Sequence, residues 1–150
     1  VGLPVTILRP MAFMELLTDK SFYPAASTWH VMPKLMGESR PLGWLCMEDL
    51  GIIAEKASAD PDRFIGEDMQ LASDVQTIEG CRAIYREVFG RSPSRFRMPV
   101  WLFQRFVGTD LTTMWRWLAT HEIDLDTGPT RAIHAGALSM REWLGRRQGP

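Results

Sequence analysis

The feature that most constrains the fold is the run Val5-Thr6-Ile7-Leu8, which Pro10 closes. A short, uncharged run of β-branched and apolar residues is typical of a strand buried in a parallel sheet. Parallel strands need crossover connections, which are usually helices, so the sequence predicts an α/β fold. Such a strand also needs neighbours on both sides. We therefore expect the chain to be the later part of a longer protein.

Further elements follow from hydrophobic periodicity and from capping residues. The predicted strands lie near 5–8, 43–47 and 68–72, and the predicted helices cover 49–59, 77–89 and 100–119. Asp49 and Thr77 are expected as helix N-caps, Gly90 as a helix end, and Gly108 as a weak point. Shorter features are a helix over 11–17, turns over 73–77 and 130–135, and a final helix over 138–144 that Trp143 anchors. Residues 18–41 contain three prolines and are predicted to be irregular, with a helical turn near 32–36.

Length and charge limit the classes of protein to consider. The 150 residues, 45% apolar and 23% charged, are typical of one globular domain. Seventeen basic and 18 acidic residues give a net charge of −1, so we expect no nucleic-acid partner and no membrane partner. We interpret the arginines between residues 82 and 105 as a solvated face rather than as a phosphate-binding patch. They are Arg82, Arg86, Arg91, Arg95, Arg97 and Arg105.

Cysteine and histidine offer no metal site. Cys46 and Cys81 are the two cysteines, they form no CxxC pair, and both lie among apolar residues. We expect buried free thiols, a reducing compartment and a cytoplasmic protein. His30, His121 and His134 lie far apart in the sequence, so no metal ion is expected.

Searches for catalytic motifs find none in this sequence. It has no GxGxxG and no Walker A pattern, so no phosphate-binding loop is predicted. Neither Tyr23 nor Tyr85 is followed four residues later by the lysine of a Tyr-x-x-x-Lys proton-transfer pair. No catalytic residue is assigned. The aromatic residues of the irregular 18–41 segment favour either an apolar pocket or ordinary loop packing, and both interpretations stay open.

An ordered set of motifs resembles the NmrA-like family of atypical short-chain dehydrogenases, which bind NAD(P). Residues 2–15, GLPVTILRPMAFME, resemble the family's GLPYTILRPxxFME, and residues 44–54 resemble its xxDIGxxA step. Residues 60–74 resemble DPExFxGxxxxLAxD, and residues 138–144 resemble LxTxEEWL. The resemblance spans nearly all of residues 1–150. It implies the C-terminal half of a Rossmann-type doubly wound parallel sheet, together with a mostly helical substrate-side part.

The resemblance also implies a site at the end of the strand over 5–8. In the family, the backbone after the Arg-Pro step borders the nicotinamide end of the cofactor. The matching positions here are Pro10, Met11, Ala12 and Phe13. The residues expected to form the substrate pocket are Phe13, Met14, Phe22, Tyr23, Trp29 and His30.

Two functions are compatible with this resemblance. The first is an NAD(P)H-dependent oxidoreductase acting on a small carbonyl, quinone or similar electrophile, with its catalytic residues outside this chain. The alternative is a non-catalytic module that senses the dinucleotide and regulates a protein partner. Because the glycine-rich turn is absent, we expect weak or no NAD(P)H binding by the chain alone. We also expect self-association through an exposed half-sheet, with Ile7 and Leu8 less covered than is usual for their type.

Overall fold

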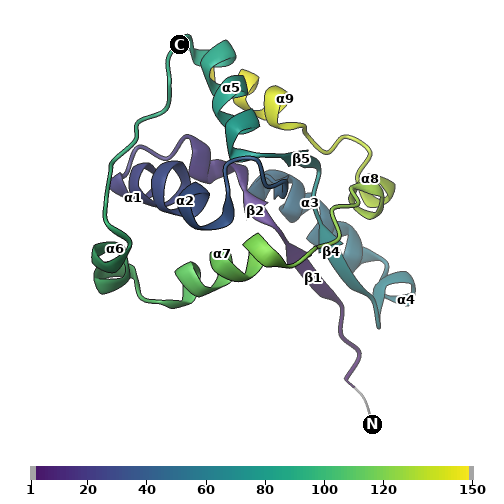
Figure 1. Ribbon diagram of the computed structural model, residues 1–150. Coiled ribbons are helices and arrows are strands. Elements are labelled where there is room, and N and C mark those ends of the chain that lie inside the picture. Colours follow the sequence, from purple (N-terminus) through teal and green to yellow (C-terminus); the bar gives the residue numbers. More distant parts are fainter. Residues whose placement is uncertain (1–2, 149–150) are drawn as a thin grey trace.

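The computed structural model describes residues 3–148 as an α/β fold with helices around a short-stranded β region (Figure 1). The strands are β1 (Ile7–Pro10), β2 (Ala12–Phe13), β3 (Leu42–Leu45), β4 (Asp68–Leu71) and β5 (Asp74–Gln76). The helices are α1 (Phe22–Ala26), α2 (Met32–Met36), α3 (Met47–Ala59), α4 (Pro61–Phe64), α5 (Ile78–Phe89), α6 (Val100–Val107), α7 (Asp110–Thr120), α8 (Gly128–Ile133) and α9 (Met140–Gly145). Residues 14–17 and 146–148 form 3₁₀ turns. No helix of these residues is long and apolar enough to cross a membrane.

The strands form two small sheets that contain parallel pairs, as the sequence predicts. β1 pairs with β4 in parallel, from Ile7 opposite Asp68 to Pro10 opposite Leu71. β2 continues the line of β1 in Figure 1 and pairs in parallel with β3. The third pair, β3 with β5, is antiparallel. Residues 73–77 are therefore not simply the predicted turn, because residues 74–76 form a strand against β3.

β1 lies two residues later than its predicted range of 5–8. Val5 makes only an isolated contact, in which its carbonyl accepts a hydrogen bond from the Gly66 N–H at 2.8 Å. β4 covers one edge of β1, and no described strand covers the other. The side chain of Ile7 is 43% exposed and Leu8 is half-buried. The expected low coverage of these two residues is thus confirmed.

The segment 18–41 is not the irregular connection predicted from its prolines, although the helical turn predicted near 32–36 is confirmed as α2. Residues 22–36 form one helical stretch, made of α1, a π-helical turn (Ser27–Val31) and α2. Pro24 lies in the first turn, where a missing N–H costs little. Pro33 cannot donate to the carbonyl of Trp29, but Arg82 Nη2 reaches that oxygen at 3.5 Å. Pro33 also lies in the first turn of its helix, α2, where a missing N–H costs little.

Three other boundaries differ from the predictions. Residues 11–17 begin as β2 before the 3₁₀ turn, rather than as a helix. The predicted helix over 100–119 divides into α6 and α7 at Gly108, whose φ is +98°. Residues 128–133 form the short helix α8, where the sequence predicts only a turn near 130–135.

Asp49 is not the N-cap of its helix. α3 begins at Met47, so Asp49 lies inside the first turn, and Cys46 at the N-cap makes no side-chain cap bond. The carboxylate of Glu15 instead accepts a hydrogen bond from the Met47 N–H at 3.0 Å. A residue 32 positions away thus caps this helix, and no local pattern reveals it.

The local capping predictions for the later helices are confirmed. The Thr77 hydroxyl accepts a hydrogen bond from the Gly80 N–H, and Gly90 ends α5 with a φ of +67°. Trp143 of α9 is 1% exposed and belongs to the main core, which also holds Trp44. A smaller cluster of Leu45, Ile53 and Leu71 packs between α3 and the strands. Cys46 and Cys81 are buried and free, as expected.

Candidate functional site

An apolar cleft of about 530 Å³ opens past the carboxyl end of β1. In open α/β sheets, ligands bind outside the carboxyl ends of the parallel strands. One wall is formed by residues 9–13, and the opposite walls come from helix 22–36 and from α7. The helical side chains that line it are Tyr23, Ser27, Thr28, Met32, Leu111, Met114, Trp115, Trp117 and Leu118.

The cleft brings together five of the nine residues that the sequence singled out. They are Pro10, Met11, Ala12, Phe13 and Tyr23. The other four lie elsewhere. Met14 and Trp29 are buried in the core, and Phe22 packs on Phe96 at a centroid distance of 4.5 Å. His30 accepts a hydrogen bond from Arg95, and burial together with Arg95 lowers its pKa.

Gly43 makes room for the side chain of Met11 at the base of the cleft. The sulfur of Met11 occupies the space where a Cβ on Gly43 would begin. The amide of Gln70 donates to the same sulfur at 3.3 Å. The bulk of Met11 is thus partly accommodated by β3, and the small side chain of Ala12 lies beside it. This floor is compatible with a flat ring lying against residues 10–13.

The polar groups of the cleft are few. Burial raises the pKa of Tyr23, so its phenol stays protonated at neutral pH. The hydroxyl of Ser27 donates to the Tyr23 carbonyl at 2.7 Å. Arg9 is held by Asp68, with Nε donating to Oδ1 at 2.6 Å. Among the described residues that line the cleft there is no Asp, Glu, His, Lys or Cys, so it suits a flat apolar molecule and offers no general base.

The wall that α7 forms was not recognised from the sequence. Leu111, Met114 and Leu118 recur at helical spacing, and an apolar stripe of this kind is typical of a helix face that packs on the core. Trp115 is 5% exposed, whereas Met114 is 46% exposed. Trp117, outside that stripe, is also 48% exposed and lines the cleft. A tryptophan at an otherwise solvent-facing helix position is the signal that would have indicated this wall.

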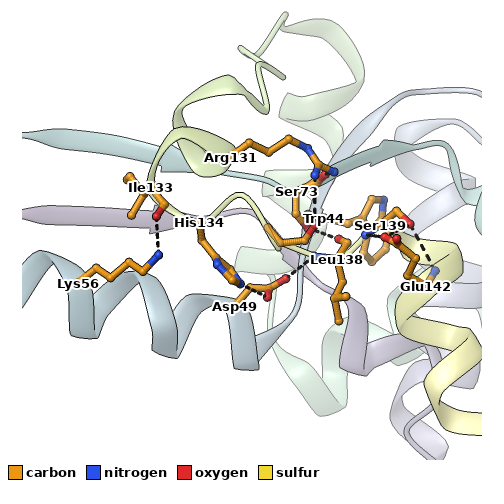
Figure 2. A network of polar contacts seen from close by, with 11 residues as sticks. Trp44, Asp49, Lys56, Ser73, Arg131, Ile133, His134, Leu138, Ser139 and Glu142 are labelled. Carbon is orange, nitrogen blue, oxygen red and sulfur yellow. Dashed lines mark hydrogen bonds and ion pairs between the residues drawn. The ribbon is translucent and has the colours of Figure 1, made fainter.

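The buried Asp49 and the partly buried His134 form a pair that has the composition of a catalytic dyad (Figure 2). His134 Nε2 lies 3.2 Å from Oδ1 of Asp49, and the Leu138 N–H donates to Oδ2 at 2.8 Å. The Ser73 hydroxyl in turn donates to the Leu138 carbonyl at 2.7 Å. These contacts fasten residues 131–142 to α3 and to the β4–β5 connection. We assign the pair a structural role.

No second chemical centre emerges from the thiols or from metal-binding side chains. Burial raises the pKa of Cys46 to about 12, so its thiol is not a nucleophile at neutral pH. Within residues 3–148, no three His, Cys, Asp or Glu side chains are grouped so that they hold a metal ion. The cleft is therefore the candidate site.

Comparison with known proteins gives matches among solved structures alone. No family model matches the sequence, and no curated protein matches it. A structure of NmrA, a negative transcriptional regulator in complex with NAD, matches with a TM-score of 0.64 and 16% identity. That match covers 97% of this chain and 52% of the NmrA chain.

Two further matches agree with the first. NmrA in complex with NADP matches with a TM-score of 0.62 and 17% identity, over 96% of this chain and 52% of that one. A nucleoside-diphosphate-sugar epimerase from Staphylococcus aureus matches with a TM-score of 0.65 and 15% identity, over 92% of this chain and 50% of that one. The chain spans about half the length of these structures. At these identities the likeness concerns the fold, and it confirms the fold that the resemblance to NmrA-like proteins predicted: over the matched half, this chain has the NmrA fold.

Proposed function

We propose that the chain forms the substrate side of an NAD(P)H-dependent oxidoreductase acting on a small carbonyl, quinone or similar electrophile. The observation that carries the proposal is the apolar cleft at the carboxyl end of β1, where residues 10–13 form one wall. This is the edge at which doubly wound sheets bind their ligands. The NmrA structures crystallised with NAD and NADP support a nicotinamide dinucleotide as the cofactor.

Each wall of the cleft has a distinct role in this proposal. The backbone of residues 10–13 borders the nicotinamide, while Met32 and the α7 side chains cover the substrate and exclude water. When bound, NAD(P)H supplies the hydride. We assign the phosphates to residues outside this chain, because its sequence has no glycine-rich turn. Reduction of a carbonyl also needs a proton donor, and we place that catalytic group outside this chain as well. The two buried free thiols support a cytoplasmic location.

A regulatory module that senses the dinucleotide and binds a protein partner is the second candidate. Two observations favour it: the matched NmrA is a negative transcriptional regulator, and α6 exposes two large aromatic side chains. Trp101 is 69% exposed and Phe106 is 76% exposed. Exposed aromatic residues are typical of protein–protein interfaces.

The cleft is tested by titrating the 150-residue chain with the quinone menadione, while backbone amide shifts are recorded by nuclear magnetic resonance. We expect shift changes at Met11, Phe13 and Leu118. Ala12→Leu narrows the cleft and should weaken this binding about tenfold, since the added methyl groups collide with the ring. Ala59→Leu, at an exposed position of α3, is the matched control and should leave binding unchanged. Shift changes scattered over the surface would contradict the proposal.

A second measurement separates the two candidate functions. In a longer protein that contains this chain and a glycine-rich turn, the oxidoreductase should consume NADPH when menadione is added. Binding of NADPH without consumption would favour the regulatory module.

A further inference from the structure

A second cavity, of about 580 Å³, lies between the start of helix 22–36, the end of α5 and the loop that follows α5. It shares no lining residue with the cleft. Helix 22–36 separates the two, because it turns Tyr23 and Thr28 toward the cleft and Ala25 and Trp29 toward this cavity. A ligand here would therefore be distinct from the substrate proposed above.

The rim of this cavity is positively charged. Lys20, Arg91 and Arg147 line it, against the single carboxylate of Asp19. Asp19 already accepts hydrogen bonds from the Ser21 N–H at 2.8 Å and from the Ser21 hydroxyl at 3.0 Å. No ion pair to a described residue engages Lys20 or Arg91. Because Lys20 and Arg91 face one carboxylate that is already occupied, the cavity favours an anion.

The cations have defined anchor points. Gly90 ends α5 in the left-handed conformation, and this turn places Arg91 at the rim. Arg147 lies over the ring of Trp143 at 3.7 Å, and its Nη2 is 4.0 Å from a Glu15 oxygen. Stacking on Trp143 limits the positions of this guanidinium, which reduces the entropy lost when it binds an anion.

The inner wall is aromatic. Trp29, Tyr85 and Phe89 line it. The ring of Tyr85 meets the ring of Trp29 edge-on, with the ring centroids 5.9 Å apart. The ring centroids of Tyr85 and Phe89 are 4.6 Å apart. Such a wall suits a flat apolar ring better than it suits a bare inorganic ion.

The outer wall is a loop tied to the helix. The Phe96 N–H donates to the carbonyl of Ala25 at 3.0 Å, and the ring of Phe96 packs on Phe22. Pro93 of the same loop is buried and lines the cavity with Ser94. These contacts hold the wall in place without a ligand, so little ordering is needed on binding.

We propose that this cavity is a binding site for a small aromatic carboxylate, separate from the cleft. The carboxylate pairs with Lys20 and Arg91 at the rim, and the ring lies against Tyr85 and Phe89. The carboxylate and the ring have different partners, so both are required for binding.

The test is a titration of the 150-residue chain with indole-3-acetate, followed through backbone amide shifts. Tryptamine carries the same ring with a positive charge, and acetate carries the charge without the ring. We expect indole-3-acetate to shift the amides of residues 18–21 and of Arg91, Ser92 and Ser94. Both other probes should bind at least about tenfold more weakly. Lys20→Gln and Arg91→Gln should each raise the Kd about threefold, since each removes one partly exposed charge. Arg105→Gln, on α6 and outside the cavity, is the matched control.

Added salt should weaken the binding of indole-3-acetate but not that of menadione in the cleft. Equal affinity for tryptamine, or an unchanged Kd in both rim variants, would overturn the proposal. Shifts confined to Ala12, Phe13 and Leu118 would overturn it as well, because they would place the ligand in the cleft.

Discussion

At the scale of single residues, Gly43 of β3 decides how the floor of the cleft is packed. Its φ is not positive, so the requirement for glycine comes from space and not from backbone strain. The sulfur of Met11 and the Cβ of Ala72, at 2.9 Å, both crowd the position of a Cβ there. The thioether can move, but Ala72 belongs to the chain leaving β4 and moves only with the backbone.

Gly43→Ala should therefore lower the free energy of unfolding by about 1–3 kcal/mol, as overpacked cores do. Urea unfolding measures this change. Gly51→Ala is the matched control, because no atom lies within 4 Å of the new Cβ and the residue is on α3. The control should raise stability by about 0.5–1 kcal/mol, since alanine favours a helix. A Gly43→Ala variant as stable as the control would show that the floor is more open than described.

The two thiols make the stability depend on pH at the alkaline end. Burial raises the pKa of Cys46 and of Cys81 to about 12, against about 8.5 for a thiol in the unfolded chain. Between these values the unfolded chain loses thiol protons that the folded chain keeps. Their stabilising effect is thus complete below about pH 8.5 and declines as the pH rises toward about 12.

We expect the urea concentration at the unfolding midpoint to decrease as the pH is raised from about 8.5 to about 10. We also expect iodoacetamide to modify neither cysteine in the folded chain. The variant with Cys46→Ala and Cys81→Ala should have a flatter pH profile. Rapid alkylation without urea would contradict the buried placement.

At the scale of elements, short-range capping and long-range support play different parts. Thr77 and Gly90 bound α5 through contacts within a few residues. α3 is instead capped from 32 residues away, because the Glu15 carboxylate accepts a hydrogen bond from the Met47 N–H. α9, like α5, is capped by residues close to it in the sequence, since Ser139 and Glu142 form a reciprocal capping box.

Ser139→Ala should cost about 1 kcal/mol of stability, because it removes the acceptor for the Glu142 N–H. Thermal unfolding measures the change. Because α9 carries the buried Trp143, loss of its cap should lower the temperature of the global unfolding transition. Ser58→Ala is the control. Its hydroxyl donates to the Ala54 carbonyl within α3 at an exposed position, and the change should stay within about 0.5 kcal/mol.

The same cap has a pH dependence at the acid end. The hydrogen bonds from Ser139 lower the pKa of Glu142. The carboxylate therefore supports the cap above its ordinary pKa, and this support is lost as the pH falls through the lowered value. A pH profile of Ser139→Ala that matches the parent chain through this range would contradict the capping role.

At the scale of the whole molecule, cofactor affinity follows from which elements the chain contains. The cleft offers walls for a ring but no glycine-rich helix start for a pyrophosphate, which normally rests on backbone N–H groups. Calorimetry with NADPH on the 150-residue chain should show no binding at micromolar concentration. Micromolar affinity would show that the phosphate-binding half is not required.

The free edge of β1 predicts self-association. Val5 is 49% exposed and Ile7 is 43% exposed beside an edge that no described strand covers. Uncovered strand edges with apolar side chains template pairing with another chain. We expect sedimentation at low micromolar concentration to show dimers or larger species, together with a low melting temperature.

Ile7→Lys should reduce this association, because it places a charge at the edge. Val107→Lys is the matched control, since Val107 is equally apolar and 41% exposed but lies at the end of α6. A monodisperse monomer with a sharp, high melting transition would contradict the prediction.

The sequence alone determined the features that depend on neighbouring residues. A strand near Pro10, the caps at Thr77 and Gly90 and the anchor Trp143 follow from side-chain chemistry within a few positions. The positions of Pro10 to Phe13 at a strand end follow from the same local pattern. Local contacts of this kind need no knowledge of the rest of the chain.

The tertiary structure decided what distant segments supply to one another. Arg82 of α5 reaches the carbonyl of Trp29, α3 is capped by Glu15, and Asp49 is a buried acceptor for Leu138 rather than an N-cap. The α7 wall of the cleft is of the same kind, since helical periodicity indicates an apolar face but not which segments that face meets. The free energies of these features come from contacts across many residues of sequence, and hydrophobic periodicity carries no information on which segments meet.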